Sequence, residues 1–177
     1  MKHHYVQYHN EDEMGPLEEG GPEGTDDNYQ VVSRKAPQDA RGSIVWLIAG
    51  AGHPRRYSVS YVFEVSDVRP CDPGDDDQFS FKYRGERGFT FEPALELEGE
   101  WFDDFVEHQA NFSFGLNTIN PFHVQELLRR TRESDPFIAS LWDDFEESRT
   151  IRRRQRGTGE FKATFHPVEP RDPKKKR

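Results

Sequence analysis

The feature that most constrains this chain is a seven-residue apolar run, SIVWLIA, at residues 43–49. Gly42 and Gly50 bound the run, and its short length and β-branched content predict a buried central strand rather than a helix. After a short GAGHPRR connection, residues 57–65 (YSVSYVFEV) alternate apolar and polar side chains. A period of two is typical of a half-buried strand. The two runs therefore predict a β-hairpin against which the rest of the domain packs.

Shorter patterns predict the remaining elements of an α+β domain. Aromatic and β-branched residues alternate in two more strand-like segments, at residues 4–9 and 79–85, the second with a short continuation at 89–93. Residues 29–33 are expected to begin a short ordered element. Apolar residues recur at helical spacing over 100–109 and 137–149. Asn120 and Pro121 are the residue types that cap and begin a helix, and they predict one over FHVQELLRRTRE.

Length and composition predict one domain with flexible parts. The chain has 177 residues, of which only 33% are hydrophobic, but its 14 Phe, 6 Tyr and 3 Trp bury large areas each. We expect a single domain over residues 1–149, interrupted by a flexible acidic loop at residues 10–28, and a basic, largely flexible segment at residues 150–177.

Charge is distributed unevenly along the chain. Residues 150–177 carry ten Lys or Arg against three Asp or Glu, whereas residues 1–149 carry fourteen against thirty, for a net charge of −9. A basic end on an acidic body can bind phosphates or the acidic face of a partner. For the final run, Lys174 to Arg177, a solvated tail that aids solubility is the simpler interpretation.

Features of secreted and membrane proteins are missing from the sequence. No stretch approaches the roughly 20 apolar residues that span a bilayer, and Met1 is followed by polar residues rather than a signal-peptide core. Cys71 is the single cysteine, so it can form no internal disulfide and no multi-cysteine zinc site. We expect a cytoplasmic protein without membrane contact.

Catalytic motifs are weak. Glu160-Phe161-Lys162 has the E-x-K spacing of some metal-dependent nucleases, but the upstream Asp135-Pro136 pair has the wrong order and no strong strand follows. The Gly50–Gly52 turn lacks the third glycine of a dinucleotide-binding loop. Asp75–Asp77 lacks the spacing of a calcium loop.

Histidine spacing also gives no metal motif. No H-x-x-x-H pair lies on a convincing helix, and strand alternation puts His4 and His9 on opposite faces. The sequence therefore predicts no metal, no cofactor and no catalytic residue.

A cluster of aromatic and amide residues offers a different chemistry. Aromatic rings can stack on a nucleobase, and Asn side chains can donate to and accept from its edge. Simple burial in the core is the alternative interpretation for the aromatic members. The predicted ligand-binding residues are Tyr8, His9, Asn10, Trp46, Asn111 and Phe112.

The order of the predicted elements resembles the PUA-like superfamily, in particular its EVE and ASCH branches. A first strand ends in YVQYHN, a short polar element (VVSRK) follows, and GSIVWLIAG at residues 42–50 stands where that family has a GDxVYLW strand, paired with RRYSVSYVFEV. The layout, including NFSFG at 111–115, also resembles uncharacterised bacterial proteins. The resemblance covers roughly residues 4–130. It implies a small α+β domain with a curved β-sheet or barrel and peripheral helices, and binding of nucleic acid with a modified base turned into an aromatic pocket.

Three functional hypotheses follow. The first is a non-catalytic module that binds DNA or RNA, with phosphate contacts from Arg34, Lys35, Arg55 and Arg56. The second is a protein-interaction module that docks on a partner through the helix at residues 137–145. The third is a metal-dependent nuclease or a nucleotide hydrolase that uses Glu160.

Overall fold

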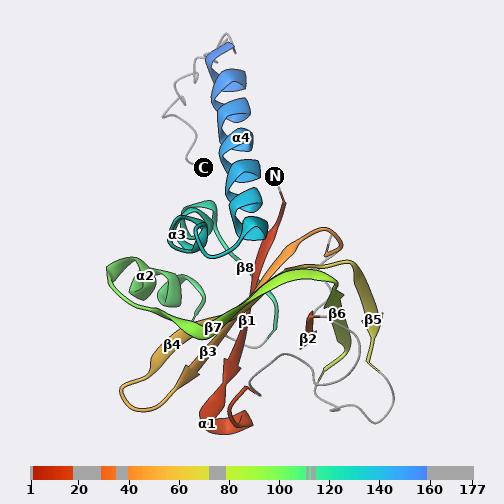
Figure 1. Cartoon of the computed structure of the whole chain (residues 1–177), viewed down its shortest axis with the longest axis vertical. Helices are drawn as coiled ribbons and strands as arrows, with labels where there is room; N and C mark the ends of the chain where they lie inside the picture. Colours follow the sequence, from red (N-terminus) through yellow and green to blue (C-terminus); the bar gives the residue numbers. More distant parts are fainter. Residues whose placement is uncertain are drawn as a thin grey trace, which may run out of the picture.

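The computed structural model describes residues 2–17, 29–34, 40–71, 79–110, 112 and 115–158, with side chains described as far as residue 152. Over these residues the protein is mixed α+β (Figure 1). The strands are β1 (His4–Asn10), β2 (Tyr29–Ser33), β3 (Ile44–Ala51), β4 (Arg56–Glu64), β5 (Asp67–Pro70), β6 (Phe81–Gly85), β7 (Arg87–Leu97) and β8 (Asn117–Thr118). The helices are α1 (Glu11–Met14), α2 (Glu100–His108), α3 (Pro121–Thr131) and α4 (Pro136–Thr158).

The strands form two sheets. The large sheet has the order β7-β4-β3-β1-β8, and the small sheet has the order β2-β6-β5. The predicted hairpin of β3 and β4 is confirmed, and β1 lies parallel to β3 on its other side. Neither sheet of the described residues closes on itself, so the expected barrel is replaced by two open sheets.

The central strand β3 is buried on both faces. Its even-numbered residues, among them Ile44, Trp46 and Ile48, pack into a core that includes side chains of α2, α3 and α4. Val45 and Leu47 point the other way, into a second core with the small sheet. Because both faces are covered, the strand is apolar throughout, which explains the unbroken run in the sequence. Figure 1 shows α2 and α3 on one side of the large sheet and the small sheet on the other.

The apolar face of α4 is part of the core. Phe137, Ile138, Leu141 and Phe145 are buried and pack in the helix-side core, and Trp142 is half-buried beneath the guanidinium of Arg132. The second hypothesis needs this face for a partner. In this structure the domain itself covers the apolar face of residues 137–145, so the face is not available to a partner.

Most short elements were predicted, with shifted bounds. The strands β1 and β6 and the helices α2 and α3 are confirmed, and the short ordered element expected at residues 29–33 is the strand β2. Residues 89–93 belong to the separate strand β7, and residues 11–14, predicted as loop, form the helix α1. Residues 18–28 of the expected acidic loop and 159–177, with Glu160, lie outside the described residues. Among the helices described, none has the length and apolar content needed to cross a membrane.

Two buried polar side chains join β1 to β3. Trp46 has no exposed surface, and its indole Nε1 donates a hydrogen bond to Nδ1 of His4 over 3.1 Å. Burial, together with the positive charges of Lys2 and His3, lowers the pKa of His4 from 6.5 to about 3. The imidazole is therefore neutral in the folded protein, as its acceptor role requires.

This arrangement predicts a specific pH dependence of stability. Because the folded-state pKa of His4 lies below its unfolded-state value of 6.5, the contribution of His4 is complete above pH 6.5 and is lost as the pH falls toward 3. The expected slope is about 1.4 kcal/mol per pH unit. The variant His4→Asn retains an acceptor for Trp46 but does not titrate, so it should lack this slope. Urea unfolding between about pH 7.5 and 5 measures it.

The control for this experiment is His53→Asn, which changes an exposed histidine of the β3–β4 turn. It should keep the wild-type slope. An acid-induced loss of stability that is as steep in His4→Asn as in the wild type would exclude a neutral buried His4.

Candidate functional site

The structure assigns two predicted pocket residues to the core. Trp46 is fully buried and hydrogen-bonded to His4, so neither face of its ring is exposed to a base. Phe112 is 5% exposed, and its ring stacks on Tyr8 with centroids 4.8 Å apart. Asn111 lies outside the described residues.

The other predicted pocket residues occupy the end of β1 and are held by neighbours. Arg55 Nη1 donates to the hydroxyl of Tyr8 over 3.1 Å. His9 Nε2 lies 2.8 Å from the carbonyl oxygen of Gly15, on the opposite face of the strand from Tyr8. Asn10 Oδ1 is buried with no hydrogen-bond partner among the described residues. Tyr8, Asn10 and Arg55 are thus close together, but Phe112 covers the ring that would stack on a base.

A hollow of about 280 Å³ lies near the β3–β4 turn, just below the usual size of a ligand pocket. Its charged lining consists of Glu11, Glu96 and Arg56. Because two carboxylates and one guanidinium line this hollow, its charge disfavours the binding of phosphate. Arg56 is the one predicted site residue in this lining.

The predicted phosphate-binding residues are divided between the sheets. Arg34 follows β2 in the small sheet, whereas Arg55 ends the β3–β4 turn of the large sheet and Arg56 begins β4. Lys35 lies outside the described residues. Arg55 also forms an ion pair with Asp12 at 3.4 Å, which weakens the attraction of Arg55 for an anionic ligand.

A stronger concentration of positive charge lies on the small sheet. Along β6, Tyr83 points inward and is fully buried, so alternation turns Lys82 and Arg84 outward. The strand register places Arg69 of β5 directly opposite Lys82. We call the outward set of Arg41, Arg69, Lys82 and Arg84 the basic face.

Within the described strands, one carboxylate partly compensates the charge of the basic face, and it lies directly opposite Arg84. Asp67 is the one carboxylate within β2, β5 and β6, and it is shared by Arg69 and by Arg41, whose Nη2 lies 3.2 Å away. Arg84 Nε donates to the side-chain oxygen of Gln30 over 2.9 Å. Like charges that face each other across two strands destabilise a sheet. The pairing of Arg69 with Lys82 therefore concentrates positive charge at this point of the sheet, next to the carboxylate of Asp67.

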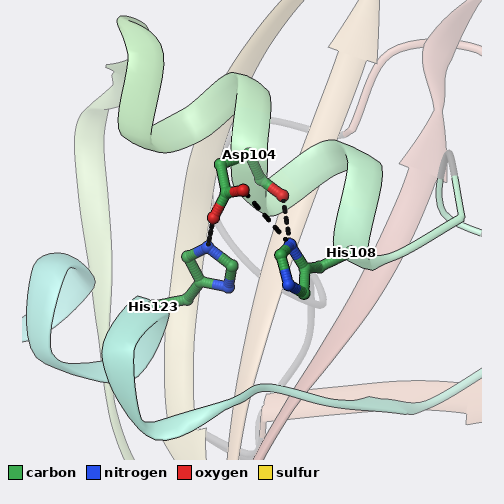
Figure 2. A group of neighbouring side chains, drawn as sticks. All are labelled: Asp104, His108 and His123. Carbon is green, nitrogen blue, oxygen red and sulfur yellow. Dashed lines mark hydrogen bonds and ion pairs between the residues drawn. The ribbon is translucent and has the colours of Figure 1, made fainter.

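A second cluster joins the helices α2 and α3 (Figure 2). Asp104 and His108 are four residues apart on α2, so they share one face of the helix. His123 lies in the first turn of α3, where Asn120 Oδ1 accepts a hydrogen bond from its backbone N–H over 2.9 Å. The cap thus holds His123 in place against α2.

The distances within this cluster are short. Asp104 Oδ2 lies 2.8 Å from His123 Nε2, and Asp104 Oδ1 lies 3.4 Å from His108 Nδ1. One ligand atom from each residue lies within 4.8 Å of the other two. His108 Nδ1 also makes a 2.9 Å contact with the backbone carbonyl oxygen of Asp104.

Burial divides the cluster into one buried and two exposed side chains. His123 has no exposed surface, whereas the side chains of Asp104 and His108 are 48% and 54% exposed. His123 Nδ1 is buried without a hydrogen-bond partner among the described residues, and Nε2 makes the contact with Asp104.

The sequence contained one signal for this cluster. The signal is the spacing of Asp104 and His108, four residues apart on a helix that was predicted correctly. A search for two histidines at this spacing misses the pair, because one of its members is an aspartate. His123 belongs to a second helix, and its approach to the pair depends on tertiary packing.

Comparisons with known proteins add no relative. No family model matches the chain, and neither a curated protein nor a solved structure shows significant similarity to it. The candidate sites are therefore argued from the geometry and charge of this chain alone.

The cap of α3 gives a testable prediction. The variant Asn120→Ala removes the acceptor for the backbone N–H of His123 and should lower the free energy of unfolding by about 1 kcal/mol. The matched variant Asn120→Asp keeps the acceptor and adds a negative charge at the helix N-terminus, so it should be at least as stable as the wild type. Urea unfolding measures both. Equal losses in the two variants would contradict the assigned cap.

Proposed function

We propose that the protein is a non-catalytic nucleic-acid-binding module that contacts the phosphate backbone through the basic face. The observation that carries this proposal is the set of Arg69, Lys82 and Arg84 on adjacent strands, with Arg41 beside them and one carboxylate among them. Most hydrogen bonds between proteins and nucleic acids go to phosphate and sugar, and Arg and Lys are their main donors.

The charge of the whole chain supports a localised contact. A net charge of −9 opposes polyanion binding over most of the surface. A positive area on such a body restricts a polyanion to one face and orients it on approach. Binding of this kind depends on counterion release, so it weakens steeply with salt.

The chemistry of the basic face favours contacts that do not depend on base sequence. The outward positions of the small sheet, as far as β2, β5 and β6 define them, are charged, amide or aliphatic, with Val32 opposite Lys82. None provides an aromatic ring on which a base could stack. The resemblance to PUA-like domains supports nucleic acid as the class of ligand. A pocket for a turned-out base is less favoured, because two of its predicted lining residues, Trp46 and Phe112, are buried in the core.

The proposal predicts a measurable salt slope. Binding of a fluorescently labelled single-stranded oligonucleotide, followed by anisotropy, should give a slope of log K against log salt of about −2, as expected for about three phosphate contacts. The double variant Arg69→Gln/Arg84→Gln should reduce the slope to about −0.7, because each neutralised contact removes about 0.7. Comparing the affinities for DNA and RNA oligonucleotides of the same sequence shows which of the two nucleic acids the protein prefers.

The matched control is Arg55→Gln/Arg56→Gln, which removes the same charge at the start of β4 in the large sheet. It should bind with the wild-type slope. A salt-independent signal, or an equal loss of binding in the two double variants, would reject the basic face as the contact surface.

A further inference from the structure

We propose that Asp104, His108 and His123 form a binding site for one divalent transition-metal ion, with Zn²⁺ as the fitting occupant. The cluster lies on α2 and α3, on the side of the large sheet away from the small sheet. It is therefore separate from the basic face, and either proposal can fail while the other stands.

The donor set selects the class of metal. Two imidazole nitrogens and one carboxylate oxygen suit zinc and its neighbours in the first transition row. Magnesium and calcium prefer oxygen ligands alone, so two histidines among three donors disfavour them. The absence of thiolate from the cluster disfavours Cu(I), which is a soft ion.

The distances are close to those that an ion requires. Bonds of 2.0–2.1 Å in a tetrahedral zinc site place two donor atoms about 3.3 Å apart. The 3.4 Å separation of Asp104 Oδ1 and His108 Nδ1 already has this value. Asp104 Oδ2 and His123 Nε2 lie 2.8 Å apart at hydrogen-bond distance. For Nε2 to bind a cation, any proton on Nε2 must leave to solvent and the neutral ring must carry its proton on Nδ1. The cation would then take the place of the hydrogen bond and push the two atoms slightly apart.

The more distant donor atoms must move closer together to reach the tetrahedral spacing, and the exposed side chains can make this movement. No two donor atoms are more than 4.8 Å apart, so closure needs a displacement of about 1.5 Å at most from the tetrahedral spacing. Asp104 and His108 are about half exposed and can rotate, with His108 exchanging its local contact to the Asp104 carbonyl for the metal. The buried His123 provides the fixed ligand. Solvent reaches the site from the side of the two exposed residues.

The local charge favours a cation. Helix α2 (EWFDDFVEH) contains four carboxylates and no Lys or Arg, and three of those carboxylates flank Asp104 on the same short helix. A metal bound by three protein groups also keeps at least one position for water, which is the pattern of open rather than closed zinc sites.

The alternative is a purely structural hydrogen bond between Asp104 and His123. In that case His108 contributes nothing, because its side chain is exposed and its removal leaves the bond between Asp104 and His123 in place. His108 is therefore the residue that distinguishes a metal site from a hydrogen bond.

The test uses the full chain without an affinity tag, with Zn²⁺ in isothermal titration calorimetry. The wild type should bind one ion per chain. The variants Asp104→Asn and His108→Ala each remove one ligand at an exposed position and should weaken binding at least tenfold, since even groups outside the ligand shell cost 10–100-fold when removed. The controls Asp143→Asn and His53→Ala remove the same group types at exposed positions outside the cluster and outside α2, and should bind as the wild type does.

A second variant tests coordination directly. His108→Cys exchanges one zinc ligand for another, so it should retain binding, and with Co²⁺ it should gain a near-ultraviolet absorption band from the cobalt–thiolate bond. Absence of that band, or equal Zn²⁺ affinity in the wild type and His108→Ala, would overturn the proposal. Circular dichroism shows whether each variant remains folded.

Discussion

The rest of this structure depends on the burial of β3 from both sides. One face of the strand joins the core that α2, α3 and α4 complete, and the other joins the core shared with the small sheet. A chain with only 33% hydrophobic residues can support two cores because large aromatic side chains fill them. The helices and the small sheet are thereby fixed on opposite sides of one strand.

This division also separates the two candidate sites. The basic face belongs to the outer surface of the small sheet, and the cluster of Asp104, His108 and His123 belongs to helices that cover the opposite side. Each site lies on regular elements whose inner faces are buried, so the core holds the backbone of both. A site on a rigid element keeps its geometry more closely than one on a loop.

Local patterns in the sequence predicted the helices and strands but not the tertiary contacts between them. The run at residues 43–49 and the Asn120-Pro121 start of α3 specify strand and helix through spacing and capping, which are local. The alternation of Tyr83 with its charged neighbours could in principle reveal the basic face. The position of β5 beside β6 could not be read from the sequence, because the register of Arg69 against Lys82 is a long-range contact. Trp46 shows the same limit, since an aromatic residue in a strand can line a pocket or fill a core.

The two buried histidines show how environment decides what one residue type can do. His4 Nδ1 accepts a bond from a buried indole, so the ring is held neutral between two strands and has no route to solvent chemistry. His123 is equally buried, but its Nε2 faces a carboxylate whose own side chain is about half exposed. A proton between a nitrogen and a solvent-accessible carboxylate can be exchanged for a metal ion, whereas an indole N–H cannot. The difference lies in the partner of each ring, which the strand pairing and the helix packing determine.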